Sequence, residues 1–284
     1  MPESQIRKAG SIPAVFRAAH QILDAHPKIL DDPVAIGLVE GSSESEIRVQ
    51  TAELQQPFQR LARALFVLRS RFVEDQLAEA VKAGVRQYIL LGAGLDTFAY
   101  RQPAWATTLR IIEVDQPASH AFKRHCLGHA GVAIPDNVAF CPLDFEHTTL
   151  QEGLGSVAFD RQVPTFFSWL GVTQYLTSTA IEATLRWVCT LPAASGIAFT
   201  FVLPDALLAG DDLQVTRFYT ALAASYGAPW ITRFEPRPLR QWLLDLGFSA
   251  IFHLSPAEAT ARYFAGRPDG LPTPMLEQLM HAVV

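Results

Sequence analysis

The chain has 284 residues, of which 49% are hydrophobic, so it is long enough to bury the core of one α/β domain. A formal net charge of −5 and the absence of an extended basic run disfavour nucleic acid as a partner. Three cysteines, none in a Cys-x-x-Cys pair, argue against a disulfide framework or a zinc knuckle and favour a reducing compartment. The first ten residues lack the apolar core of a signal peptide, and the longest apolar window, 196–210, is too short to span a bilayer. We therefore expect a cytoplasmic protein without a membrane partner.

Helical elements are predicted in the N-terminal part of the chain. Apolar residues at helical spacing run from Ile12 and end near Pro27, and Pro33 lies in the first turn of a second, short helix. Residues 41–45 are polar and are expected to form a mobile loop. A long amphipathic helix is predicted over 61–83.

By analogy with other nucleoside-binding α/β enzymes, we interpret residues 1–60 as a helical lid. Residues 61–284 are then the core of a single domain.

Strands and helices alternate after residue 84, which predicts a mostly parallel sheet with helices on both faces. A seventh strand, antiparallel or parallel, has to come from the residues after 254, where the pattern gives it no position. The fold class is therefore α/β, a Rossmann-like seven-stranded sheet whose ligands lie outside the carboxyl ends of the strands. The expected strands are 87–91, 109–114, 138–141, 165–170, 197–203 and 249–254, and the expected helices are 96–101, 117–129, 179–191, 211–226 and 238–246.

A tight glycine turn, Gly92-Ala93-Gly94, follows the first predicted strand, and Asp96 comes directly after it. Glycines let a ligand approach the backbone closely, although two glycines in such a turn can also be purely steric. The third glycine of a dinucleotide fingerprint would fall at Thr97, and the Asp96 carboxylate would repel a phosphate at the start of the following helix. A cofactor that carries an adenosine but no phosphate fits better, and S-adenosylmethionine is the common one.

Carboxylates follow the second and third predicted strands. Asp115 is the expected acceptor for the ribose hydroxyls, and Glu113 is expected to point to the opposite face of the sheet. A cap for the helix that begins at Pro117 is the alternative role for Asp115. Asp144 is expected to accept the exocyclic amine of adenine while Phe145 offers its backbone N–H or its ring, and a plain loop or cap role is as good for Asp144 alone.

Arg69 and Arg71 lie on the helix that leads into the first strand. A guanidinium has the geometry to hold the carboxylate of an amino-acid moiety. Helical spacing separates the two arginines by about 200°, so only one of them is expected to face the ligand, and a solvated surface position is the alternative for either.

No metal site is expected. His120, His125 and His129 lie with Cys126 on one predicted helix, where a solvated helix face is the better interpretation. The chain has neither the Gly-x-Ser-x-Gly turn of a hydrolase nor a Walker phosphate loop.

These motifs together resemble the bacterial class I S-adenosylmethionine-dependent methyltransferases of the leucine carboxyl methyltransferase type. The resemblance covers most of the chain and implies that Arg69 or Arg71 holds the methionine carboxylate and that Gly92 lines the donor. It also implies Asp115 at the ribose and Asp144 with Phe145 at the adenine. One departure is Leu170, where family members usually have a glutamate that contacts the methionyl part. The motifs that carry the resemblance are Arg17-Ala18-Ala19-His20, Asp31-Asp32-Pro33, Arg69-Ser70-Arg71-Phe72, residues 91–97, residues 113–117, Leu143-Asp144-Phe145 and residues 171–176.

The sequence therefore predicts methyl transfer from S-adenosylmethionine to a carboxylate or hydroxyl of a mostly apolar small molecule. The acceptor pocket is expected between the N-terminal segment, the stretch from Trp169 to Tyr175 and the loops after the fifth strand, including Trp230. His20 would serve as a base for a hydroxyl acceptor, or else only packs the lid. The alternatives are a nicotinamide-dependent oxidoreductase and a protein that binds S-adenosyl compounds without turnover.

Overall fold

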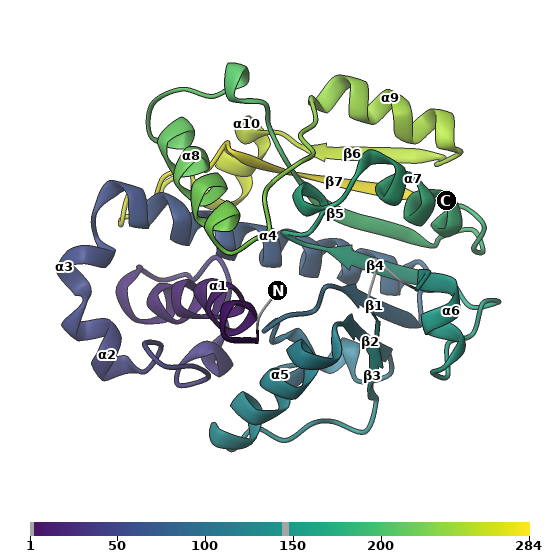
Figure 1. The fold of residues 1–284 in the computed structure, drawn as a ribbon, viewed down its shortest axis with the longest axis horizontal. Helices are drawn as coiled ribbons and strands as arrows, with labels where there is room; N and C mark the ends of the chain where they lie inside the picture. The colour runs from purple at the N-terminus through teal and green to yellow at the C-terminus, as the bar shows by residue number, and fades with distance from the viewer. Residues whose placement is uncertain (1–2, 144–147) are drawn as a thin grey trace.

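The computed structural model describes residues 3–143 and 148–284, so Asp144 and Phe145 lie outside the described residues. Seven strands form one sheet in the order β3-β2-β1-β4-β5-β7-β6, shown in Figure 1. The last strand of the chain, β7, runs antiparallel to both of its neighbours, β5 and β6. The strands are β1 (Gln87–Leu91), β2 (Arg110–Asp115), β3 (Val138–Pro142), β4 (Thr165–Trp169), β5 (Gly196–Val202), β6 (Ala250–Leu254) and β7 (Glu277–Val283).

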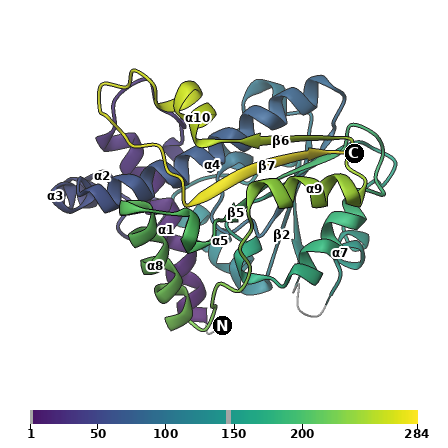
Figure 2. The same ribbon diagram turned by 90° about the horizontal axis from the view of Figure 1, so that it is seen from above.

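Helices cover both faces of the sheet, as Figure 2 shows with α4 and α10 on one side and α7 and α9 on the other. The N-terminal helices and α8 lie at the carboxyl ends of the parallel strands (Figure 1). The longer helices are α1 (Glu3–Leu23), α4 (Pro57–Lys82), α5 (Pro117–His129), α7 (Ser178–Val188), α8 (Gly210–Ser225) and α9 (Pro236–Leu246). The short ones are η1 (Pro33–Ala35), α2 (Glu44–Val49), α3 (Thr51–Leu54), η2 (Phe98–Tyr100), η3 (Ala104–Ala106), α6 (Leu150–Gly155), η4 (Thr173–Tyr175), η5 (Asp205–Leu207), α10 (Pro256–Ala259) and η6 (Thr260–Phe264).

The core consists of two large apolar clusters, one on each face of the sheet. Alternate side chains of β1 enter different clusters: Ile89 and Leu91 pack with α7 and α9, whereas Tyr88 and Leu90 pack with α4. All five residues of β1 are buried, which is typical of a parallel strand that is covered on both faces. The predicted Rossmann-like, mostly parallel seven-stranded sheet is confirmed.

Several local predictions need correction. The helix expected over 96–101 is a single 3₁₀ turn, Phe98–Tyr100. The loop expected over 41–45 ends in the start of α2, where the Ser43 hydroxyl accepts from the backbone of Glu46 and the Glu46 carboxylate accepts from the backbone of Ser43. This reciprocal capping gives the end of the segment a defined helical geometry.

His281 on β7 gives the fold a pH dependence. Its Nδ1 lies 2.9 Å from the Gln76 side-chain oxygen on α4, and burial lowers the pKa of the imidazole to about 4. In the unfolded chain the imidazole takes up a proton below about pH 6.5, so its contribution to stability is present above that pH and is lost as the pH falls towards 4.

The free energy of unfolding of the wild type should fall between pH 6.5 and pH 4. We expect this fall to be smaller in His281→Gln, by on the order of 3 kcal/mol. Urea titrations across this range measure it, with the exposed His129→Gln as the matched control. Equal slopes in wild type and His281→Gln would contradict the assignment.

Candidate functional site

The glycine turn after β1 is held against the end of β2 by backbone hydrogen bonds. The amides of Gly92 and Ala93 both donate to the carbonyl of Val114, at 2.8 and 3.1 Å. The Gly94 amide donates to Asp115 Oδ2 at 2.6 Å. Gly92 and Gly94 have φ angles of +69° and +45°, a region that side chains with a Cβ rarely adopt. The predicted turn and the predicted acid are therefore one unit at the carboxyl edge of the sheet.

Asp115 is half-buried, and its carboxylate has acceptor positions that the protein does not use. Its Oδ1 accepts from the adjacent Gln116 amide at 2.7 Å, and Gln116 is the N-cap residue directly before α5, where no side chain caps the helix. The helix-capping alternative for Asp115 is thus not what the structure shows. A carboxylate offers about four acceptor positions, and the bonds to Gly94 and Gln116 use two of them.

The space around Gly92 and Gly94 differs, so alanine should destabilise the fold by different amounts at the two positions. A Cβ on Gly92 would lie 2.6 Å from Cγ2 of Val172, whereas a Cβ on Gly94 would meet no atom nearer than 3.9 Å. We expect Gly92→Ala to destabilise the fold by about 3 kcal/mol, through backbone strain and overlap together. Gly94→Ala should cost about 1 kcal/mol, from backbone strain alone. Chemical denaturation measures both, and equal losses would contradict the geometry.

Asp96 closes the turn locally and makes the site unfavourable for phosphate. Its Oδ1 accepts from the Phe98 amide at 2.9 Å. Burial is the main cause that raises the pKa of the nearby Glu74, and the negative charge of Asp96 adds to it. A pyrophosphate placed here would meet the same repulsion.

Glu113 does not point away from Asp115, so that prediction is wrong. Residues two apart in a strand share a face, and Glu113 contacts α5, where Lys123 Nζ donates to it at 2.7 Å. The Tyr100 hydroxyl donates to it as well, at 3.1 Å. Glu113 and Lys123 are fully buried, so this carboxylate is bound within the protein and is not exposed to a ligand.

Of Arg69 and Arg71 on α4, only Arg69 faces the carboxyl edge of the sheet. Its guanidinium packs over the Phe66 ring, 4.7 Å from the centroid, and fills the space beside Gly171, where a Cβ would lie 2.7 Å from Nη1. Arg71 points elsewhere, since it donates to Asp75 at 2.8 Å and to the Ile29 carbonyl at 3.1 Å. Arg69 is therefore the arginine at the edge where the ligand is expected, and Arg71 is a surface residue with a 42% exposed side chain.

A cavity of about 670 Å³, counting space open to solvent, lies next to Arg69. The three segments expected around the acceptor all contribute to it, but Trp169 is fully buried in the core and does not. Leu170 is half-buried and packs against the α4 side of the sheet. The lining residues are Ile12, Pro13, Leu65, Phe66, Arg69, Gly171, Gln174, Tyr175, Tyr219, Leu222, Ala223, Tyr226, Trp230, Leu276 and Glu277.

The N-terminal motifs hold the helical segment onto the glycine turn. Arg17 donates to the Leu95 carbonyl at 2.6 Å and to Asp32 at 2.8 Å, and the Thr97 hydroxyl donates to the same Asp32 oxygen at 2.7 Å. Although burial opposes it, the positive charges of Arg17 and Arg101 hold the pKa of Asp32 below its usual range. Sequence patterns alone did not indicate this scaffolding role.

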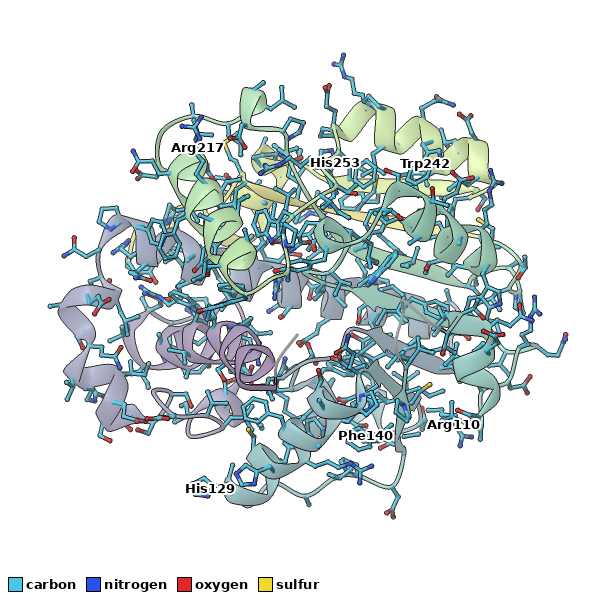
Figure 3. All side chains as sticks on the ribbon, viewed as in Figure 1. Arg110, His129, Phe140, Arg217, Trp242 and His253 are labelled. Carbon is cyan, nitrogen blue, oxygen red and sulfur yellow. The ribbon has the colours of Figure 1, made fainter. Side chains whose placement is uncertain are left out.

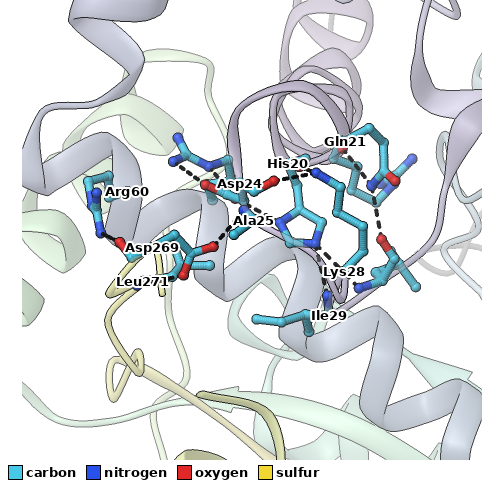
Figure 4. A network of polar contacts seen from close by, with 12 residues as sticks. His20, Gln21, Asp24, Ala25, Lys28, Ile29, Arg60, Asp269 and Leu271 are labelled. Carbon is cyan, nitrogen blue, oxygen red and sulfur yellow. Dashed lines mark hydrogen bonds and ion pairs between the residues drawn. The ribbon is translucent and has the colours of Figure 1, made fainter. Parts of the chain in front are cut away.

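His20 belongs to a second internal network, drawn in Figure 4. Its Nδ1 lies 2.7 Å from Asp24, and its Nε2 accepts from the Ile29 amide at 3.1 Å. Asp24 also accepts two bonds from Arg63, both at 2.7 Å. Burial lowers the pKa of His20, and both of its ring nitrogens are engaged, so it packs the N-terminal segment and is not a base that faces the cavity.

Comparisons with known proteins decide the family. The sequence profile described as leucine carboxyl methyltransferase matches residues 11–189. YktD of Bacillus subtilis, named as a candidate S-adenosyl-L-methionine-dependent methyltransferase, is 31% identical over 216 residues, which cover 76% of this chain and 71% of that protein. The similarly named SCO7813 of Streptomyces coelicolor is 32% identical over 207 residues, or 71% of this chain and 67% of that protein. The chain belongs to the leucine carboxyl methyltransferase family.

The fold of this family member agrees with solved structures. A candidate methyltransferase from Thermobifida fusca matches with a TM-score of 0.56 at 15% identity, over 96% of this chain and 94% of the other. A DUF574 family protein from Streptomyces avermitilis matches with a TM-score of 0.54 at 14% identity, over 94% of this chain and 96% of the other. The protein is an S-adenosylmethionine-dependent methyltransferase, and S-adenosylmethionine is its cofactor. The resemblance predicted from the motifs is confirmed.

Metal sites and membrane-spanning helices are the two further features that could bear on the function of this methyltransferase. Within residues 3–143 and 148–284, no group of three or more histidine, cysteine or acidic side chains is arranged to hold a metal ion. Figure 3 places His129 at the outer end of α5, away from the sheet. None of the described helices combines the length and the apolar character that crossing a bilayer requires.

Proposed function

We propose that this methyltransferase acts on an oxygen atom, carboxylate or hydroxyl, of a small molecule in the cytoplasm. The observation that carries the proposal is the glycine turn bonded to Asp115, together with a cavity of aromatic walls that is lined by Gly171, the neighbour of the Val172 side chain at Gly92. Phe66, Tyr175, Tyr219, Tyr226 and Trp230 contribute those walls. Such walls suit a mostly apolar acceptor of modest size.

The residues at the edge of the sheet fit the methyl donor. Asp115 would take the ribose hydroxyls, since two of its acceptor positions are free of the bonds to Gly94 and Gln116. The backbone of Gly92, Ala93 and Gly94 would line the donor, because open space lies where a Cβ of Gly94 would be. Arg69 would hold the carboxylate. Asp144 and Phe145, outside the described residues, remain our proposal for the adenine.

The main contributions of the chain's own residues are to align the acceptor with the donor and to exclude water, and proton transfer is secondary. When bound, the donor provides an electrophilic methyl group on a positively charged sulfur. The α1 and α8 side chains that border the cavity, such as Ile12 and Leu222, exclude water from the acceptor. Positioning of the acceptor oxygen in line with the methyl group is then the main contribution to the rate. A carboxylate acceptor is ionised at pH 7 and needs no base, which agrees with the internal role of His20.

Transfer of a labelled methyl group from S-adenosylmethionine to a small molecule tests this function. The protein is incubated with methyl-labelled S-adenosylmethionine and a small-molecule extract, and the labelled products are treated with mild alkali. We expect labelled product, with methanol released by alkali for a carboxylate acceptor and a stable ether for a hydroxyl. Label found only on nitrogen or on macromolecules would contradict the proposal. Tight binding of the donor without any release would favour a non-catalytic binding protein.

A further inference from the structure

Glu277 brings a carboxylate to the same cavity from the far end of the chain. It is the first residue of β7 and pairs with Val202, the last residue of β5. The segment before it is fixed by Asp212 of α8, whose Oδ1 accepts from the amides of Met275 and Leu276 at 2.8 and 3.0 Å. The Glu277 carboxylate therefore has a defined position beside Arg69, although 208 residues separate the two.

The ion pair between Arg69 and Glu277 is loose for its degree of burial. Nη1 of Arg69 lies 3.5 Å from Oε1 of Glu277, whereas charge-assisted bonds are usually about 2.7–2.9 Å. The two side chains are only 13% and 4% exposed. Among the side chains that the structure describes, Arg69 is the only ion-pair partner of Glu277. A buried pair is stabilising only when further hydrogen bonds satisfy its charges, so this pair has unused capacity on both sides.

Gln174 adds a second unused acceptor on the cavity wall. Gln174 is 4% exposed, and its Oε1 is buried without a hydrogen-bond partner. Its backbone is held in place, because its carbonyl accepts from the Ile231 amide at 2.7 Å. Buried acceptors of this kind are rare unless a ligand or water completes them. The wall thus presents the Arg69 guanidinium, the Glu277 carboxylate with one long bond from Arg69, and the Gln174 oxygen without a donor.

A ligand group that complements this set carries a carboxylate and an ammonium on the same carbon atom. We infer that Arg69, Glu277 and Gln174 bind the α-amino-acid head group of the methyl donor, which rests on the proposed function. Arg69 takes the carboxylate, and Glu277 with Gln174 accepts from the ammonium, which has three N–H donors. Glu277 thereby supplies the negative charge that Leu170, an apolar side chain at the end of β4, cannot.

Binding of three adenosyl compounds, measured by calorimetry, tests this assignment without any turnover. S-adenosylhomocysteine carries both charges, its deaminated analogue keeps only the carboxylate, and 5′-methylthioadenosine lacks the head group. We expect wild type to bind S-adenosylhomocysteine roughly 10-fold or more tighter than the deaminated analogue. In Glu277→Gln this preference should fall to about 3-fold or less, with 5′-methylthioadenosine affinity unchanged. Glu182→Gln removes a carboxylate on α7 whose side chain is 36% exposed; it is the matched control and should behave as wild type.

Two results would overturn the inference. One is a wild type that binds S-adenosylhomocysteine and its deaminated analogue equally. The other is a Glu277→Gln variant that weakens both compounds alike, because Glu277 would then only position Arg69. If Glu277→Gln does not fold, Gln174→Met is titrated instead. It should at least halve the preference for S-adenosylhomocysteine over the deaminated analogue. An unchanged preference would contradict the inference. Failure of wild type to bind any adenosyl compound would instead count against the proposed function.

Discussion

Replacement of Asp115 by asparagine should weaken the binding of S-adenosylhomocysteine by roughly 10- to 100-fold, which is the usual range for the loss of hydrogen bonds to a charged group. The asparagine oxygen can still accept from the Gly94 amide, which Asp115 Oδ2 now does at 2.6 Å. The turn should therefore keep its geometry, and the loss should fall on the ribose hydroxyls. Calorimetric titration of both proteins gives the ratio of the two affinities.

A second ligand makes the Asp115 experiment specific. A 2′,3′-dideoxy analogue of S-adenosylhomocysteine has no ribose hydroxyls, so wild type and Asp115→Asn should bind it with similar, low affinity. The Glu182→Gln variant, at a partly exposed position on α7, controls for the loss of one charge. If Asp115→Asn bound S-adenosylhomocysteine as tightly as wild type, the ribose assignment would be wrong.

Removal of Arg63 should cause the largest loss of stability among the ion pairs discussed. Arg63 and Asp24 have side-chain exposures of 0% and 3%, and the two bonds between them tie α4 to the N-terminal segment. Arg63→Met leaves the buried Asp24 carboxylate without its cation, and breaking such a pair costs about 3–5 kcal/mol. Urea denaturation at pH 7 measures the loss, together with a fall of roughly 10 °C in the melting temperature.

An exposed pair in the same segment is the natural control. Arg48 and Glu44 on α2 are both 61% exposed, and Arg48→Met should cost no more than about 1 kcal/mol. Similar losses for Arg63→Met and Arg48→Met would show that the buried network does not hold the N-terminal segment in place.

The strands and the contact between the glycine turn and Asp115 were predictable because they depend on short, continuous sequence patterns. Apolar runs such as Tyr88–Leu91 mark strands that are buried on both faces, and the carboxyl ends of parallel strands meet at one edge. That rule predicts from the sequence alone that Asp115 lies at the same edge as the glycine turn. The position of β7 was not predictable, because its antiparallel insertion between β5 and β6 depends on pairing with distant strands.

Three short helices are marked in the sequence by capping residues, although their apolar periodicity does not predict them. α2, α6 and α10 each begin with a serine or threonine followed three residues later by a glutamate, and each pair forms a reciprocal cap. The apolar stripe of such short helices is too brief for periodicity to detect, whereas the capping residues are visible in sequence. The pairs are Ser43 with Glu46, Thr149 with Glu152, and Ser255 with Glu258.

The remaining errors concern which way side chains point and what lies opposite them. Glu113 was placed on the wrong face although the two-residue period of a strand puts it with Asp115. The choice between Arg69 and Arg71 depended on Gly171 and Ile29, which come from other parts of the chain. No sequence pattern marks Glu277 as a site residue, because its role depends on contact with Arg69, which is distant in the sequence.

The central claim is that the carboxyl edge of this sheet binds an adenosyl sulfur compound and not a dinucleotide. Parallel calorimetric titrations of the wild-type protein with S-adenosylhomocysteine and with NADH test it most directly. We predict saturable one-to-one binding of S-adenosylhomocysteine and no heat of binding for NADH. Saturable binding of NADH, with S-adenosylhomocysteine giving none, would contradict the account.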